Sequence, residues 1–267
     1  YLKLEGEANM IKTALTIAGS DCSGGAGIQA DLKTMTMHGV YGMSVITALT
    51  AQNTRGVSAV CPVTEECFRQ QIDSIFTDIV PDAVKIGMIG SKCLIPILAE
   101  RLAYYQADNL VIDPVMGSTS GTEFLGREGK TELAKRLFPM ARLITPNLLE
   151  AERLVNRTIQ RKAEREAAAV EMGQRYGCSV LLKGGHAAED ADDFLYEIKQ
   201  NRKIWISGER YYVSNTHGTG CTLSAAIVSN LAKGKELEES VRPAKEYISG
   251  ALQKEIFLGH GNGPLNH

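Results

Sequence analysis

The sequence predicts an α/β fold in which a mostly parallel central sheet carries helices on both faces. Short apolar runs alternate with helical patterns along the chain, which is typical of βαβ units. Polar residues stand directly after several of these runs, where parallel sheets bind their ligands. No repeat, composition shift or linker divides residues 10–267, so we expect one domain.

The order of the elements follows from these patterns. Strands are expected where short apolar runs stand between turn residues: 14–18, 44–51, 83–86, 110–112, 143–144 and 180–182, with short antiparallel strands within 195–212. Helices are expected where apolar residues recur every three or four positions: 27–38, 65–76, 93–105, 128–137, from about 148, 163–175, 221–233 and 238–257.

Two segments are expected to lie outside this framework. Residues 1–9 precede Met10 and are interpreted as a flexible leader or an expression remnant. Residues 117–129 follow a strand end and are rich in glycine, serine and threonine, which is typical of a lid over an active site and equally of a plain connection.

Composition excludes several classes of protein. The 267 residues are 44% hydrophobic and 22% charged, as in an average soluble protein. The formal net charge of −2 leaves no basic patch for nucleic acid, and no apolar run is long enough for a membrane helix, so we expect a cytoplasmic protein. Its six cysteines form no C-x-x-C pair, which favours reduced thiols over disulfides or structural zinc.

Polar groups follow five of the predicted strands. Because the carboxyl ends of parallel strands meet at one edge of a sheet, we expect these groups to surround one ligand site. They are Gly19-Ser20-Asp21, Gln52-Asn53, Lys85-Ile86-Gly87-Met88, Asp113-Pro114 and Lys183-Gly184-Gly185.

The strongest motif is Asn215-Thr216-His217-Gly218-Thr219-Gly220-Cys221, which leads directly into a predicted helix. Gly218 and Gly220 allow backbone N–H groups to converge on an anion at the positive end of the helix, and a transferring phosphoryl group would fit there. The alternative is an ordinary glycine-rich helix start capped by Thr219.

Cys221 falls in the first turn of this helix, where the helix dipole is expected to lower the pKa of a thiol. It could act as a nucleophile with His217, or as a base that accepts a proton from a substrate hydroxyl. The alternative is a buried, inert cysteine.

Familiar nucleotide motifs are absent. The G-x-G-x-x-A pattern of residues 25–30 is not followed by the acidic residue that a dinucleotide site requires, and the chain has no P-loop. Asn147 and Glu150 are compatible with a structural capping box, or with a place near Mg²⁺ and phosphate oxygens.

Taken together, residues 18–31 and 46–54 closely resemble the hydroxymethylpyrimidine/phosphomethylpyrimidine kinases of thiamine biosynthesis, in the ribokinase superfamily. The resemblance continues through residues 85–88, 113–116, 144–147, 183–186, 215–221 and 259–261. It implies a three-layer α/β/α homodimer that uses ATP and Mg²⁺ to phosphorylate 4-amino-5-hydroxymethyl-2-methylpyrimidine and then its monophosphate.

The resemblance also implies roles for single residues. Gln52 would bind the aminopyrimidine, and Cys221 would be the base in place of the aspartate found in most of the superfamily. The other implied positions are Ala26, Met88 and Val115 in the pyrimidine pocket, Lys183, Gly218 and Gly220 at the transferring phosphate, Thr219 and Asn147 at the ATP cofactor, and Asp113 and Glu150 at Mg²⁺.

Elementary chemistry leaves some of these roles open. The amide of Gln52 offers a donor beside an acceptor, as an aminopyrimidine requires, but the alternative is a buried glutamine satisfied by the backbone. Lys183 could be a solvated surface lysine, Asp113 could merely shape a turn, and His217 is more simply structural.

Three other functions are compatible with the sequence. A pyridoxal kinase would share the fold, and Gln52 argues against it because pyridoxal carries a phenolic oxygen on its ring edge. A thiol hydrolase could use Cys221 with His217. A regulator that binds a pyrimidine or a nucleotide without turnover is the third alternative.

Overall fold

A computed structural model describes residues 11–117, 125–185, 190–211, 213 and 215–267. The predicted leader, residues 1–9, lies outside the described residues. So does most of the predicted lid, at residues 118–124. Both therefore stay predictions.

The described strands form one sheet in the order β3-β2-β1-β4-β5-β6-β7-β8-β9. Strands β1, β2, β4, β5, β6 and β7 run parallel. At one edge β3 is antiparallel to β2, and at the other β8 is antiparallel to β7 and β9 to β8. The strands are β1 (Thr13–Asp21), β2 (Tyr41–Asn53), β3 (Gly56–Pro62), β4 (Ala83–Ile86), β5 (Leu110–Ile112), β6 (Leu143–Ile144), β7 (Ser179–Leu182), β8 (Asp193–Glu197) and β9 (Arg202–Ile206).

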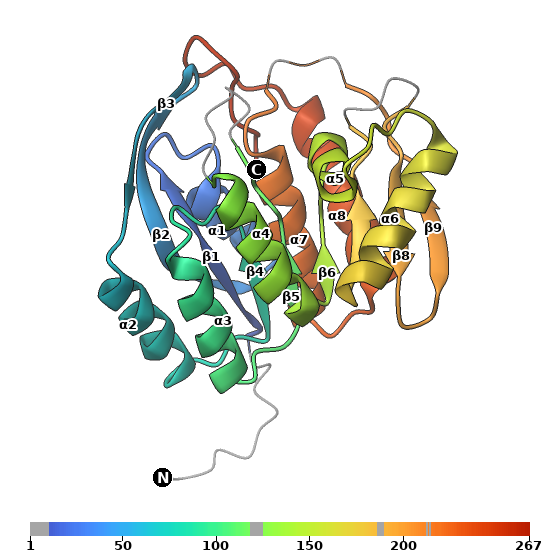
Figure 1. Ribbon diagram of the computed structural model, residues 1–267. Helices are drawn as coiled ribbons and strands as arrows, with labels where there is room; N and C mark the ends of the chain where they lie inside the picture. The colour runs from blue at the N-terminus through green and yellow to red at the C-terminus, as the bar shows by residue number, and fades with distance from the viewer. Residues whose placement is uncertain (1–10, 118–124, 186–189, 212, 214) are drawn as a thin grey trace, which may run out of the picture.

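Helices cover both faces of the sheet, which confirms the predicted layers (Figure 1). One face carries α2 (Glu65–Phe76), α3 (Leu94–Tyr104), α4 (Arg127–Arg136), α5 (Leu148–Val155) and α6 (Lys162–Tyr176), with a 3-10 turn at Phe138–Met140. The other face carries α1 (Gly27–Met37), α7 (Thr219–Ala232) and α8 (Leu237–Gln253).

Alternation along the strands divides the core into two apolar clusters, one under each helical layer. In β1, Leu15 and Ile17 belong to the cluster that contains Phe68 of α2, whereas Ala14 belongs to the cluster that contains Met35 of α1. Side chains on a strand point alternately to opposite faces, so a sheet buried on both faces needs apolar residues at consecutive positions.

Three element boundaries differ from the prediction. The second strand extends to Asn53 and turns into β3, which the sequence did not reveal because most of its side chains are exposed and show no clear alternation. The antiparallel region ends at Ile206 rather than at residue 212, and the last helix ends at Gln253 rather than at residue 257.

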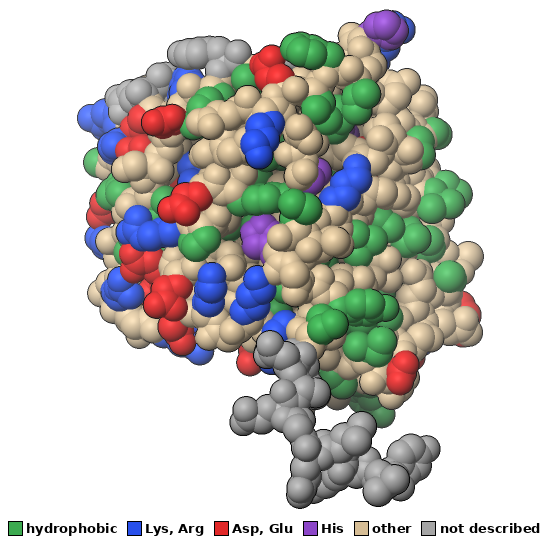
Figure 2. Space-filling model, turned by 180° about the vertical axis from the view of Figure 1, so that it is seen from behind, with side chains coloured by type: hydrophobic (Ala, Val, Ile, Leu, Met, Phe, Trp, Pro, Cys, Tyr) green, Lys and Arg blue, Asp and Glu red, His purple; other side chains and the backbone are tan. Residues whose placement is uncertain are grey.

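The surface fits the predicted charge balance. On the face opposite to that of Figure 1, basic and acidic side chains are interspersed and no broad area of one sign stands out (Figure 2). Within the described part of the chain, no helix is both long and apolar enough to cross a membrane.

Candidate functional site

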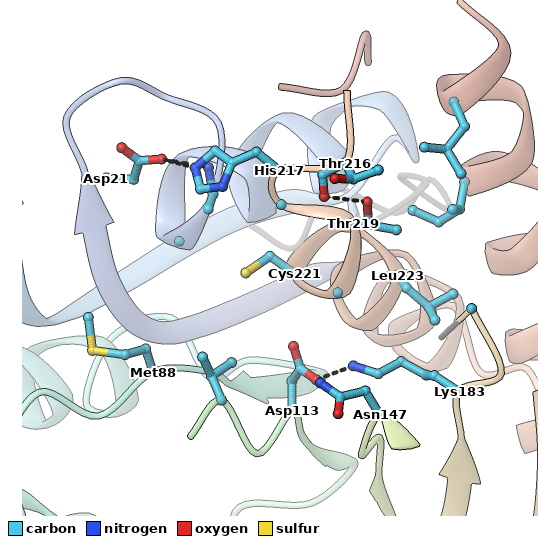
Figure 3. Close-up of a pocket in the computed structure, with 18 of the residues that line it drawn as sticks. Asp21, Met88, Asp113, Asn147, Lys183, Thr216, His217, Thr219, Cys221 and Leu223 are labelled. Carbon is cyan, nitrogen blue, oxygen red and sulfur yellow. Dashed lines mark hydrogen bonds and ion pairs between the residues drawn. The ribbon is translucent and has the colours of Figure 1, made fainter. Parts of the chain in front are cut away.

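A cavity of about 510 Å³ opens at the carboxyl ends of the parallel strands, where the sequence predicted a site. It is bounded on one side by the loop that starts α7 and on the other by the ends of β5 and β7 (Figure 3). Every predicted site residue lines this cavity: Ala26, Gln52, Met88, Asp113, Val115, Asn147, Glu150, Lys183, Gly218, Thr219, Gly220 and Cys221. Gly117, the first residue of the predicted lid, lines it as well.

The loop before α7 has the geometry of an anion site. Gly218 is the residue before the first helical turn, has a φ of 84°, and provides no side-chain cap for the free N–H groups. Thr219 is the first helical residue, and its hydroxyl donates to the Thr216 carbonyl at 2.7 Å (Figure 3). The alternative of a helix capped by Thr219 is therefore wrong, and the helix start stays open to a ligand.

This loop interlocks with the glycine-rich loop between β1 and α1. A methyl group on Gly218 would collide with the Gly25 carbonyl oxygen, and one on Gly25 would come within 2.5 Å of the His217 ring. Two glycines are thus required for the close approach of the loops. The two segments are about 190 residues apart in sequence and together form one wall of the cavity.

Cys221 sits between the two loops. Its sulfur accepts a hydrogen bond from the backbone N–H of Gly27, at the start of α1. Burial raises the pKa of the Cys221 thiol to about 11, and the nearby Lys85 ammonium offsets only part of that rise. The predicted lowering of this pKa by the helix dipole is wrong, because loss of hydration outweighs the dipole, and the thiol is protonated near neutral pH.

A buried group of charges faces Cys221 across the cavity (Figure 3). The Lys183 ammonium donates to Asp113 at 2.8 Å, and the Thr145 hydroxyl donates to the same carboxylate oxygen at 3.0 Å. Burial alone would raise the pKa of Asp113, but Lys183 and Lys85 hold it below its usual value. Lys183 is therefore a partly buried ion-pair partner, and its interpretation as a solvated lysine is wrong.

Glu150 lies beside this group at the start of α5. Burial raises the pKa of its carboxyl group to about 7, and the Asp113 charge adds to the rise. Asn147 and Glu150 form the predicted capping box, since Asn147 Oδ1 accepts from the Glu150 N–H at 2.9 Å and Glu150 Oε2 accepts from the Asn147 N–H at 2.8 Å. Because both residues also line the cavity, the capping box does not exclude a role at the site.

The opposite end of the cavity holds Asp21, His217 and Gln52. His217 Nε2 lies 2.9 Å from Asp21 Oδ2 and 3.0 Å from the Gln52 amide nitrogen (Figure 3 shows the first contact). Burial would raise the pKa of Asp21, but hydrogen bonds from His217 and from Ser23 lower it to about 2. The amide of the half-buried Gln52 contacts the side chains of Thr50 and His217, so the alternative of a buried glutamine satisfied by the backbone is wrong.

This arrangement bears on the interpretation of His217 as a partner of Cys221. Its Nε2 atom is turned toward Asp21, on the far side of the ring from the α7 helix (Figure 3). A thiol nucleophile needs a base within hydrogen-bond reach and a lowered pKa. The position of His217 and the pKa of Cys221 both argue against a thiol hydrolase.

The C-terminal segment contacts two of the loops next to the cavity. The His217 N–H donates to the Gly263 carbonyl at 3.2 Å, and the N–H groups of His260 and Gly261 reach the Thr54 hydroxyl at 3.2 Å. The segment therefore connects the α7 loop to the turn between β2 and β3.

A buried ion pair below the site was not predicted. Lys85 was expected among the polar groups that face the ligand, but both Lys85 and Asp31 are fully buried under the loops, where the ammonium donates to Asp31 at 2.8 Å and 3.0 Å. Residue 85 points to the face covered by α1 because its neighbours Val84 and Ile86 fill the opposite cluster.

Several further residues line the cavity and carry no sequence signal. They come from the segment before the α7 loop and from the facing sides of α7 and α8, and they include Glu209, Arg210, Tyr211, Leu223, Lys245, Ile248 and Leu252. Side chains on the inner side of a helix resemble any core residue in sequence, so only the fold identifies them as part of the site.

Known proteins share this fold and this sequence. The family model described as phosphomethylpyrimidine kinase matches residues 21–266. A hydroxymethylpyrimidine/phosphomethylpyrimidine kinase of Escherichia coli is 44% identical over 262 residues, covering 95% of this chain and 96% of that protein. The thiamine biosynthesis bifunctional protein ThiED of Geobacter sulfurreducens is 45% identical over 96% of this chain, which spans about half (52%) of that longer protein.

Two solved structures extend the likeness. The crystal structure of a phosphomethylpyrimidine kinase from Clostridium difficile matches with a TM-score of 0.80 and 45% identity, over 90% of this chain and 99% of the other. An ADP complex of pyridoxal kinase from Bacillus subtilis matches with a TM-score of 0.87 and 36% identity, over 96% and 97% of the two chains. The predicted ribokinase-like fold is thereby confirmed.

Proposed function

This chain belongs to the phosphomethylpyrimidine kinase family, and from that membership we propose that it is an ATP-dependent kinase of thiamine biosynthesis. It would phosphorylate the hydroxymethyl group of 4-amino-5-hydroxymethyl-2-methylpyrimidine and then the resulting monophosphate. The observation that carries the proposal is a single cavity lined by a donor–acceptor amide, an open helix N-terminus and an ion-paired lysine.

The pyrimidine would bind at the end that contains Gln52. Its amide supplies one donor and one acceptor side by side, which matches an amino group next to a ring nitrogen. Ala26, Met88 and Val115 line the same cavity and would supply apolar contacts to the ring and its methyl group.

The transferring phosphoryl group would lie at the start of α7. Phosphoryl transfer has a loose transition state, so catalysis depends mainly on position and charge stabilisation. The N–H groups of Gly218 and Gly220 would receive the phosphate oxygens, and the Lys183 ammonium would neutralise part of their charge.

Cys221 would accept the proton of the attacking hydroxyl group. Because the pKa of the Cys221 thiol is about 11, its thiolate is a strong base, but only a small fraction of Cys221 is in the thiolate form near neutral pH. We therefore expect turnover to rise with pH, which gives this role a kinetic signature that an inert cysteine would lack.

Asp113 and Glu150 would hold Mg²⁺, mainly through water molecules. Their oxygen atoms line the cavity and suit a hard cation, and Mg²⁺ usually keeps several of its waters. The described residues contain no group of three or more acidic, His or Cys side chains that could hold a metal by themselves, which fits a cation shared with ATP. When bound, Mg²⁺ supplies charge neutralisation for the phosphates.

ATP would occupy the part of the cavity between the α7 loop and α8. Thr219 and Asn147 stand where its phosphates would enter, and Leu223, Ile248 and Leu252 provide an apolar surface for the base. The solved pyridoxal kinase relative contains ADP, which supports nucleotide binding in this fold.

Pyridoxal kinase activity is the second candidate function, because a solved relative that is 36% identical carries that name. Gln52 favours the aminopyrimidine over pyridoxal, whose ring edge carries a phenolic oxygen. No contact within the described site favours pyridoxal over the aminopyrimidine.

The first experiment incubates the purified protein with Mg²⁺-ATP and either the hydroxymethylpyrimidine or pyridoxal, and identifies the products by mass spectrometry. We expect mono- and diphosphorylated pyrimidine. Phosphorylated pyridoxal alone would overturn the proposed substrate while leaving the phosphate site in place, and ligand binding without ATP consumption would favour a regulator.

Two further features belong to this proposal. Four of the six free cysteines are exposed, which suits a reducing compartment such as the cytoplasm. A homodimer is proposed from the family resemblance, and edge strand β3 offers a free backbone edge that a second copy could cover. Light scattering after gel filtration would test it.

A further inference from the structure

We infer that His217 and Thr50 fix the orientation of the Gln52 amide, so that the site accepts a 4-aminopyrimidine and rejects its 4-oxo counterpart. This inference rests on the proposed function and names the residues that make the site prefer the 4-amino compound over the 4-oxo compound. It follows from the hydrogen-bonding capacity of four side chains.

The first constraint comes from Asp21 and His217. Asp21 accepts N–H groups from Ser23, Gly25 and Ala26, and its low pKa keeps it ionised. A carboxylate 2.9 Å from His217 Nε2 requires a hydrogen on that nitrogen, whether the ring is neutral or charged. Nε2 is therefore a donor and cannot accept a hydrogen bond from Gln52.

A donor at His217 Nε2 conflicts with an amide nitrogen 3.0 Å away, because two N–H groups would face each other. Turning the amide by 180° exchanges its oxygen and nitrogen within the same volume. The carbonyl oxygen of Gln52 then accepts from His217, which shares its N–H between Asp21 and Gln52.

The second constraint is independent of His217. The Thr50 hydroxyl donates its single hydrogen to the Ser20 carbonyl at 2.9 Å, and its oxygen lies 3.3 Å from the other end of the Gln52 amide. Since the hydrogen is already used, Thr50 can only accept from Gln52. The NH₂ group of Gln52 therefore faces Thr50, in agreement with the first constraint.

Both constraints leave one lone pair on the Gln52 side-chain carbonyl and one N–H on its NH₂ group for a ligand. The acceptor and the donor therefore stand in a fixed order along the edge of the amide. The carbonyl, on the His217 side, would accept from the 4-amino group, and the NH₂ group, on the Thr50 side, would donate to the adjacent ring nitrogen. The 4-amino carbon neighbours the carbon that bears the hydroxymethyl group, so this order places the hydroxymethyl group on the His217 side of the ring.

A 4-oxo pyrimidine reports directly on the amide orientation. Its ring N–H and carbonyl oxygen reverse the donor–acceptor order, so an amide held in one orientation opposes both groups, whereas an amide free to turn can bind either ring. Loss of fixation should thus raise activity on the wrong substrate, a result that general damage to the site would not produce.

The test measures kcat/KM for both pyrimidines in the full chain, for the wild type, Thr50→Val and His217→Phe. We expect the wild type to prefer the amino compound by at least about 10²-fold. Each variant should lower that preference about 3- to 10-fold, the value of one net hydrogen bond, with a rise in activity on the oxo compound and an unchanged KM for ATP.

Two further variants and a binding measurement complete the design. Thr50→Ser keeps the hydroxyl and should restore the preference. Ser58→Ala removes a hydroxyl on β3 that donates to the Ala51 carbonyl, away from the Gln52 amide, and should match the wild type. Calorimetric titration with the two pyrimidines gives the same ratio for any variant that folds but turns over too slowly.

The outcomes separate the inference from the proposed function. No phosphorylation of the aminopyrimidine by the wild type would overturn the proposed function, and this inference with it. Phosphorylation with an unchanged preference in both Thr50→Val and His217→Phe would overturn this inference alone. A lower preference in both, restored by Thr50→Ser, would establish it.

Discussion

Two helices begin at the edge of the same cavity and satisfy their first N–H groups in opposite ways. Helix α5 closes its own start with the reciprocal hydrogen bonds of Asn147 and Glu150. Helix α7 begins after Gly218, which adopts a left-handed conformation and has no side chain to cap the helix. Because a ligand can bind only the N–H groups that the protein leaves free, we propose α7 as the anion site, to which α5 would contribute side chains instead.

The difference also explains the choice of residues at each start. Glycine at position 218 allows the loop to approach Gly25, which any side chain would prevent. Asparagine and glutamate at α5 keep that helix stable on its own and leave the charge of Glu150 facing the cavity. We therefore expect a ligand to satisfy the free N–H groups at the start of α7, whereas the side chains of Asn147 and Glu150 already cap the start of α5.

Breaking the α7 start should have the largest effect. Gly218→Ala forces a methyl group against the Gly25 carbonyl and disfavours the left-handed backbone, so turnover should fall by at least about 10²-fold as the N–H donors move. Steady-state kinetics measures the loss. Gly234→Ala is the matched control, since Gly234 has a φ of 80° but open space around it, and it should lose only about 1 kcal/mol of stability. Similar kinetics for the two variants would contradict this interpretation.

Cys221→Ala should lower turnover about 10²- to 10⁴-fold while substrate binding persists. The thiolate population rises with pH as long as the pH is below the pKa of about 11, so wild-type turnover should increase roughly tenfold per unit from pH 7 to 9, and the variant should show no such rise. Stopped-time assays across this range measure both. Cys67 occupies the same third helical position in α2 and is exposed, so Cys67→Ala should leave the profile unchanged. A flat wild-type profile would remove Cys221 from the role of base.

Glu150→Gln separates the two roles of the α5 start. The Gln carbonyl can still accept from the Asn147 N–H, so the capping box and the melting temperature should persist, while loss of the charge should raise the Mg²⁺ concentration for half-maximal activity about 10-fold. A Mg²⁺ titration at fixed ATP, at a pH above the Glu150 pKa of about 7 so that the wild-type carboxylate is charged, measures the change. An unchanged titration would assign Glu150 to the cap alone.

The smallest effect is expected for Asn147→Ala, which removes the side-chain acceptor for the Glu150 N–H. The free energy of unfolding should fall by about 1 kcal/mol, the usual value of an N-cap. Urea denaturation measures this loss. If Asn147→Ala raised the KM for ATP and left the free energy of unfolding unchanged, Asn147 would act mainly on the nucleotide.

The sequence predicted most of the site because its residues follow strand ends. Asp113 and Lys183 are adjacent in space since β5 and β7 are parallel and flank β6. The apolar runs predicted these strands and the edge at which they end, but not their order in the sheet. It also predicted the capping box, since the Asn147 to Glu150 spacing is a local signal.

Other features depend on burial, which the sequence does not reveal. The position of Cys221 in a helix start suggested a lowered pKa, but the enclosing loops remove its water and reverse the sign. Lys85 was expected to face the ligand because it follows a predicted strand, but it is fully buried in an ion pair with Asp31. The contacts of His217 with Asp21 and Gln52 join segments about 165 to 196 residues apart, and no local pattern encodes them.

The interlocking of the loops around Gly25 and Gly218 has a practical consequence. Asp21 and Gln52 lie in the first fifth of the chain, whereas Lys183, His217 and Cys221 lie in the last third. If the chain were divided near the turn between α5 and α6, neither fragment would hold a complete site. Recovered kinase activity would then report that two separately made fragments had reassembled, which makes this fold a candidate for a split-enzyme sensor.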